Sequence, residues 1–165
     1  RKVRDGGGIT PDVELPLKEY SRLVYSLVYG GVIDSYALDY AGRHESIAPV
    51  DEFHFTEYED FISYAMTQNF DYRSSAKALY DQMKTQLEKD GIADAMKDEL
   101  SALGKAIDMD KEKFLRLKKD EIIPFIEEEI AVRYYFQKAG IKVRLRYDEQ
   151  LKKALESPMI ELSAE

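Results

Sequence analysis

KEYSRLVYSLVYGGVIDSYALDY, residues 18–40, carries the clearest structural signal in the chain. Its apolar residues recur at steps of three and four, which is the period of an α-helix and not the two-residue alternation of a strand. They are Tyr20, Leu23, Val24, Leu27, Val28, Val32, Ile33, Tyr36, Ala37 and Tyr40. Because Gly30-Gly31 lies between the two halves, the stretch predicts a helix that is bent or split at the glycines.

A second helix is expected after the loop that contains Pro49. Thr56 and Glu59 have the spacing of a capping box, in which each side chain accepts a hydrogen bond from the other's backbone N–H. The pair therefore predicts a helix that begins at Thr56. The residues expected to face inward are Phe61, Ile62, Ala65 and Met66.

The next segment predicts an antiparallel pair of helices. Ser74 or Ser75 suits the N-cap of the first helix, and Asp90-Gly91 suits its end, since glycine adopts the left-handed conformation freely. This helix is expected to bury Leu79, Tyr80, Met83 and Leu87. Residues 92–107 repeat the pattern with Ile92, Met96, Leu100 and Leu103.

The longest helical pattern covers residues 108–139, but Pro124 lacks a backbone donor and disfavours helix at the residue before it. Two segments are therefore expected, and Ala139-Gly140 should end the second. Ile126, Ile130 and Tyr134 fall on one face, and Glu129 and Arg133 form an i, i+4 pair on another. Residues 141–145 alternate like a strand, and residues 148–155 read as a last short helix.

The N-terminal segment differs from the rest. A glycine run at Gly6–Gly8 predicts a turn, and the alternation of residues 13–15 predicts a short strand that pairs with something upstream. The fold class is thus expected to be mainly α, a helical domain of five to seven helices with an N-terminal glycine-rich turn and one or two short strands. Residues 1–17 are assigned to the end of an upstream domain and residues 18–165 to the helical domain.

Composition excludes several classes of function. With 165 residues, 44% hydrophobic and 34% charged, the chain has the composition of one globular domain. Its net charge of −8 argues against nucleic acid as a partner, and no apolar run approaches the roughly 18 residues of a membrane span. The absence of cysteine excludes a thiol nucleophile and a Cys-ligated zinc site.

Three patterns resemble chemical sites, but a structural role explains each better. Ser74 and Lys77 have the spacing of a serine–lysine pair, yet a helix N-cap with a solvated lysine accounts for them. His44 and His54 lie near acidic residues without the spacing of a di-metal helix motif. Lys111, Lys113, Arg116, Lys118 and Lys119 form a basic cluster with acidic residues interleaved, as on a solvated helix face. No catalytic, cofactor-binding or metal residue is therefore expected.

Two segments carry a resemblance to a known family. The opening RKVRDGGGITPD, residues 1–12, closely resembles the segment that closes the catalytic core of carboxyl-terminal processing (tail-specific) serine proteases. The tail resembles the helical extension of some bacterial members; it comprises residues 129–135, Gly140, Asp148, Leu151 and Ala154. The middle helices are compatible with this family but contain no diagnostic motif.

The resemblance implies a parent serine endopeptidase with a Ser/Lys dyad, often with a PDZ domain, acting in the periplasm or cell envelope. Both catalytic residues of such a protease lie upstream of the glycine motif, so this chain is expected to be inactive alone. Its expected partners are its own catalytic and PDZ domains, the substrates of the parent and a second copy in a homo-oligomer, with no cofactor. A free-standing helical adaptor that binds through its aromatic residues, such as those at 134–136, remains the alternative.

Overall fold

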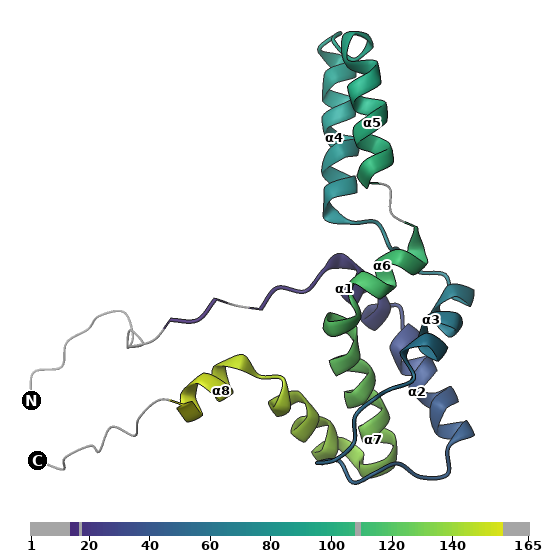
Figure 1. The fold of residues 1–165 in the computed structure, drawn as a ribbon, viewed down its shortest axis with the longest axis vertical. Coiled ribbons are helices and arrows are strands. Elements are labelled where there is room, and N and C mark those ends of the chain that lie inside the picture. The colour runs from purple at the N-terminus through teal and green to yellow at the C-terminus, as the bar shows by residue number, and fades with distance from the viewer. Residues whose placement is uncertain (1–13, 17, 108–109, 157–165) are drawn as a thin grey trace, which may run out of the picture. The chain divides into compact units, whose positions relative to one another are not determined.

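The computed structural model describes residues 14–16, 18–107 and 110–156, and these residues fold almost entirely as helices (Figure 1). Eight α-helices and one 3-10 helix form in this part of the chain. They are α1 (Arg22–Tyr29), α2 (Val32–Arg43), α3 (Tyr58–Thr67), α4 (Ser75–Lys89), η1 (Asp94–Met96), α5 (Lys97–Ile107), α6 (Lys111–Leu117), α7 (Lys119–Arg146) and α8 (Glu149–Glu156). Residues 20–148 form one compact unit, and α8 belongs to another.

The core lies between α1, α2, α3, α6 and α7, and the longest packing seam joins α2 to α7. Ile126 and Ile130 of α7 are fully buried in this core, as predicted, and so is Ile122. At its centre, the Tyr36 ring meets Phe61 edge-on, with the ring centroids 5.1 Å apart. The Tyr36 hydroxyl donates to Asp60, so its polar end stays paired while the ring is buried.

The predicted split at the glycines is confirmed. Gly31 has φ +69, a left-handed conformation that a residue with a Cβ adopts rarely, and it separates α1 from α2. The Ser74 cap is confirmed too, because its hydroxyl accepts from the backbone N–H of Lys77. Gly91, with φ +72, follows the end of α4 as expected.

Three local predictions are wrong. Helix α3 begins at Tyr58 after Glu57, with no side-chain cap, so Thr56 and Glu59 form no capping box there. Pro124 lies inside α7 rather than at a break. Its missing donor removes only one hydrogen bond near the start of the helix, and the buried residues Ile122 and Ile126 hold the helix in the core on both sides of the proline. Met66, expected inward, is exposed, whereas Phe61, Ile62 and Ala65 are buried.

The strand expected at residues 141–145 is also wrong, since these residues are helical. Of the three apolar residues in this alternation, Val143 is buried while Ile141 and Leu145 are exposed, so they do not form one buried face as they would in a strand. Gly140 does not end the helix, and the break lies earlier, at Phe136. The number of helices exceeds the expected five to seven, because the chain also turns at Lys118 between α6 and α7.

The glycine run at Gly6–Gly8 lies outside the described residues, as does Val13 of the expected N-terminal strand. Glu14, Leu15 and Pro16 are described and form no strand. In the other unit, α8 (Glu149–Glu156) matches the predicted last helix to within a residue. It is joined internally by the ion pairs Lys152–Glu149 and Lys153–Glu156.

Candidate functional site

A buried carboxylate organises the end of the domain where α7 turns. Glu127 is 1% exposed, and three donors reach it. Its Oε1 accepts from the backbone N–H of Phe55 at 2.8 Å, and its Oε2 accepts from Tyr147 Oη at 2.8 Å and Arg146 Nη1 at 3.1 Å. Burial, followed by the nearby carboxylate of Glu127, raises the pKa of Tyr147 to about 12, so the phenol stays a donor at neutral pH.

Arg146 links Glu127 to the loop between α2 and α3 by hydrogen bonds. Its Nη1 donates to the Phe53 carbonyl at 2.9 Å, and its Nη2 donates to the Val50 carbonyl. One guanidinium therefore fixes two loop carbonyls and the buried carboxylate together, which its planar fork of donors allows.

The arrangement depends on a sharp turn within α7. Phe136 has φ +62 and ψ −175, a conformation that costs a non-glycine residue roughly 1–3 kcal/mol. The turn folds residues 137–146 back onto the first part of α7. Gly140 makes the close approach possible, because a Cβ there would lie 2.6 Å from Cγ2 of Val132. Arg144 also forms an ion pair with Glu128 across the two segments.

Further contacts hold residues 44–57 against this turn. Tyr134 Oη donates to the His44 carbonyl at 2.6 Å, and Tyr135 Oη donates to the Ile47 carbonyl at 2.9 Å. Lys142 Nζ pairs with Asp51 at 3.0 Å. These donors place the loop from several sides, so it is a fixed part of the domain although it contains no helix.

The fixed loop and α7 enclose a shallow cavity of about 420 Å³. Its walls are mainly apolar, with Pro49 and Val50 on the loop and Tyr135 and Ala139 on α7, and the lysines at 138 and 142 lie at the rim. Phe136, beside it in sequence, is 79% exposed. Of the conspicuous residues 134–136, the two tyrosines thus anchor the loop and the phenylalanine faces solvent.

Ser74 and Lys77 do not form a nucleophile and base in this structure. The Ser74 hydroxyl is occupied as a helix cap, where it accepts from the Lys77 backbone at 3.1 Å. The Lys77 ammonium instead pairs with Asp81 at 3.5 Å and lies 5.0 Å from the centre of the Tyr80 ring. A nucleophile and its base must contact each other through their side chains, and these two side chains have other partners.

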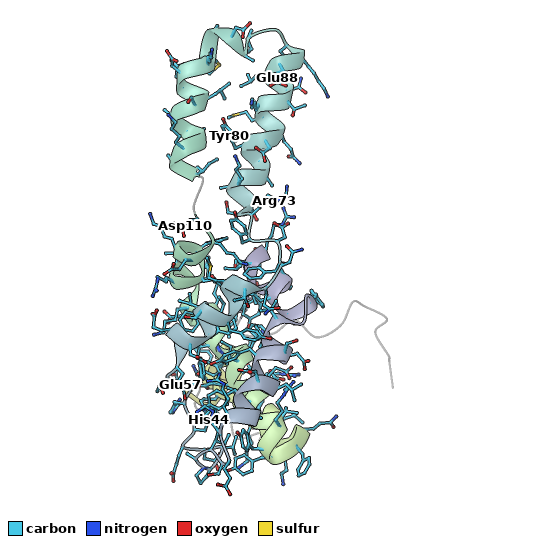
Figure 2. All side chains as sticks on the ribbon, turned by 90° about the vertical axis from the view of Figure 1, so that its right-hand side faces the viewer. His44, Glu57, Arg73, Tyr80, Glu88 and Asp110 are labelled. Carbon is cyan, nitrogen blue, oxygen red and sulfur yellow. The ribbon has the colours of Figure 1, made fainter. Side chains whose placement is uncertain are left out.

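The two histidines lie apart in separate pairs. His44 Nε2 lies 3.2 Å from Glu57, and the two side chains are labelled next to each other in Figure 2. His54 Nδ1 lies 3.6 Å from Glu127 Oε1. Within residues 14–16, 18–107 and 110–156, no group of three or more potential ligands comes together to hold a metal ion.

The basic cluster after residue 110 is divided among local partners. Arg116 bridges Glu59 and Glu112, and Lys118 pairs with Glu121 at 2.5 Å. Lys111 donates to the Gln68 carbonyl and lies over the Phe70 ring, while Lys119 lies over Tyr58. These side chains join α6 to its neighbours and do not converge on a site for phosphate.

The sequence interpretation missed Glu127 and Arg146. A signal existed for the first, because Glu127 follows Ile126 and precedes Ile130 by three positions, which places it within the apolar stripe of α7. For Arg146 there was none, since its partner lies nineteen residues earlier and meets it only through the turn at Phe136.

Comparison with known protein families identifies the family of this chain. In the part of the chain that the structure describes, no helix is long and apolar enough to cross a membrane. No curated protein and no solved structure matches the chain. One family model matches residues 23–157, and its description is a probable PDZ-protease, C-terminal helical domain. This match covers well over half of the 165 residues, so the chain belongs to the family of C-terminal helical domains of probable PDZ-proteases.

Proposed function

We propose that this chain is the non-catalytic C-terminal domain of a serine endopeptidase that processes carboxyl termini in the cell envelope. The family match over residues 23–157 carries the proposal. It is supported by the resemblance of residues 1–12 to the segment that closes the catalytic core of such proteases. The parent would cleave peptide bonds with a Ser/Lys dyad that lies upstream of residue 1.

The role proposed for the domain is to pack against the upstream catalytic domain and support it. Rigid construction fits this role, because Glu127 and Arg146 fix the loop 44–57 to α7 at the end of the domain. Catalysis by the domain itself is not part of the proposal. A serine attacks a carbonyl only with a neutral base in reach, and Ser74 has a capping role while Lys77 is paired with Asp81.

The test compares the 165-residue chain with the full-length protease, using unfolded casein and peptides that end in apolar residues. The expected result is turnover by the full-length protein alone, abolished by substitution of one upstream serine. Ser74→Ala in the full-length protein serves as the control and should retain turnover. Turnover by the isolated chain that disappears in its Ser74→Ala variant would overturn the proposal, and a full-length protein without peptidase activity would favour the adaptor alternative.

A further inference from the structure

The strained turn at Phe136 builds the shallow cavity between the loop 44–57 and α7. One wall comes from α7, on both sides of the turn: Tyr135, Lys138, Ala139 and Lys142. The loop supplies the other wall: Pro49, Val50 and Asp51. A φ of +62 is costly for phenylalanine, and backbone strain of this kind is concentrated at active sites and ligand clamps. The cavity is therefore the place to look for a ligand, and we call it the loop cavity.

The hydroxyl and two carbonyls in these walls already have partners within the domain. Tyr135 Oη donates to a carbonyl of the loop at 2.9 Å. The Pro49 carbonyl accepts from the backbone N–H of Glu52 at 2.8 Å, and the Val50 carbonyl accepts from Arg146 Nη2. A ligand in the loop cavity would thus meet mainly apolar surface in the walls.

The rim of the loop cavity has one positive charge that is not offset. Three charged residues line the cavity, and Lys142 Nζ pairs with Asp51 at 3.0 Å, so those two charges offset each other. The third is Lys138, which lies one helical turn before Lys142. In the described part of the chain, the Lys138 ammonium forms no ion pair or hydrogen bond. A free cation therefore lies beside apolar surface, in a chain whose net charge is −8.

An exposed lysine without an ion pair is ordinary on a surface helix. Lys84 on α4 is also exposed, and among the described residues it has no ion pair either. Lys138 differs from Lys84 because it borders a concave apolar surface. The volume of the loop cavity, about 420 Å³, falls within the roughly 300–1,000 Å³ of small-ligand pockets, which are mainly apolar with a few placed polar groups.

We propose that the loop cavity binds an amphipathic monocarboxylate, with its carboxylate on the Lys138 ammonium and its aliphatic part against Pro49, Val50 and Ala139. A single negative charge matches the one free ammonium, whereas a cationic ligand would meet like charge. Fatty acids and the carboxyl termini of apolar peptides share this chemistry, and the experiment below separates these two sources. The inference goes beyond the proposed function and does not depend on protease activity.

The shape of the loop cavity sets the expected strength. Because the cavity is shallow and Lys138 is exposed, the ion pair keeps much of its contact with water and contributes little more than a surface pair. For a ligand of the size of octanoate, the usual binding free energy per atom then gives a dissociation constant on the order of 1 mM.

The first test is a titration of the ¹⁵N-labelled 165-residue chain, followed by amide chemical shifts. Octanoate should shift the amides of Val50, Lys138 and Ala139 in a saturable way. Hexanoate and butyrate should each bind at least ~3-fold more weakly than the next longer acid, and acetate at least ~10-fold more weakly than octanoate, because each loses apolar contact. Octylammonium, which has the same chain and the opposite charge, should bind at least ~3-fold more weakly than octanoate.

The second test removes the cation. Lys138→Gln should raise the dissociation constant of octanoate about 3–5-fold, which corresponds to the loss of one exposed ion pair. Lys84→Gln removes the same charge from α4 and is the matched control, with a dissociation constant within about twofold of the parent. Circular dichroism of both variants checks that the helices remain formed.

A third arm identifies the source of the carboxylate. Acetyl-Leu-Leu with a free carboxyl terminus is titrated beside its terminal amide, which has the same side chains without the charge. Tighter binding of octanoate than of the peptide acid assigns the loop cavity to fatty acids. Tighter binding of the peptide acid than of both octanoate and the amide assigns it to peptide carboxyl termini.

Three results would overturn the proposal. Equal binding of octanoate and octylammonium would reduce the effect to apolar contact without recognition of charge. Equal weakening in Lys138→Gln and Lys84→Gln would show that only the total charge of the chain matters. Shifts centred on the exposed residues Leu79 and Met83 of α4, and not on the loop cavity, would place the ligand elsewhere.

Discussion

The contrast between Arg146 and Arg144 gives the sharpest stability prediction. Both arginines lie on the last turns of α7, and each pairs with one of two adjacent carboxylates, Glu127 and Glu128. The pairs differ in burial. Glu127 is 1% exposed and Arg146 is 24% exposed, whereas Glu128 and Arg144 are 19% and 71% exposed.

Arg146→Ala should lower the free energy of unfolding by about 2–4 kcal/mol, because it leaves a buried carboxylate without its cation. The variant also removes the donors to the Phe53 and Val50 carbonyls. The hydrogen bonds from Phe55 and Tyr147 to Glu127 remain, which keeps the loss below the upper end of the range for a broken buried pair. Arg144→Ala should cost less than ~1 kcal/mol, the usual worth of an exposed pair.

The assay is urea unfolding followed by helical circular dichroism. With a slope of about 2 kcal/mol per molar urea, Arg146→Ala should move the midpoint down by about 1–2 M and Arg144→Ala by less than about 0.5 M. A double variant, Glu127→Gln/Arg146→Ala, isolates the stranded charge. It should be at least ~1 kcal/mol more stable than the sum of the two single losses predicts.

Two outcomes would refute the reasoning. Equal midpoints for Arg146→Ala and Arg144→Ala would mean that Glu127 gains little from its cation in the folded protein. Strict additivity of Glu127→Gln and Arg146→Ala would mean that the two side chains act independently, contrary to their 3.1 Å contact.

Three further predictions follow from single contacts. Gly140→Val should destabilise the domain by about 1–3 kcal/mol in the same urea assay, since its Cβ would lie 2.6 Å from Val132. As a control, Gly42→Ala has open space around the added carbon and should be neutral or stabilising by up to ~1 kcal/mol. Ser74→Ala should cost about 1 kcal/mol through loss of the helix cap, and hydrogen exchange should quicken in the first turn of α4 rather than throughout. Burial and then Glu57 raise the pKa of Tyr40 to about 12, from about 10 in the unfolded chain. The contribution of the neutral phenol to the free energy of unfolding is therefore present below pH 10 and is lost as the pH rises to 12. Tyr40→Phe should make the decline in the free energy of unfolding over this pH range shallower.

Periodicity predicted the helices whose apolar stripe meets the core. Ile126 and Ile130 are buried as expected, and Gly31 divides α1 from α2 through its positive φ. Local signals succeeded where the whole interaction is local, as at Ser74, whose partner is three residues away. They failed at Thr56 because the packing of Tyr58 and Phe61 determines where α3 begins, without a side-chain cap.

Long-range contacts account for the remaining failures. The residues at 141–145 alternate like a strand, but the turn at Phe136 folds them onto α7 and leaves only Val143 buried. Nothing local indicates that turn, since Phe136 is a poor residue for φ +62. The surrounding contacts of Gly140 and Arg146 hold it in place. Such contacts join residues that are far apart in the sequence, so local sequence patterns cannot predict them.

Two places in the domain depart from the pattern of an amphipathic helix, in which apolar residues are buried and charged residues are exposed. The free-energy cost of the departure differs between them. At Glu127 a charge lies in the apolar stripe, and the chain satisfies it internally with Phe55, Arg146 and Tyr147. On α4, Leu79 and Met83, which the sequence pattern predicts to be buried, are 64% and 40% exposed in the described part of the chain. A buried charge without donors is strongly destabilising, so Glu127 needs partners within the folded chain. Exposed apolar side chains cost less, because they leave no buried polar group without a partner.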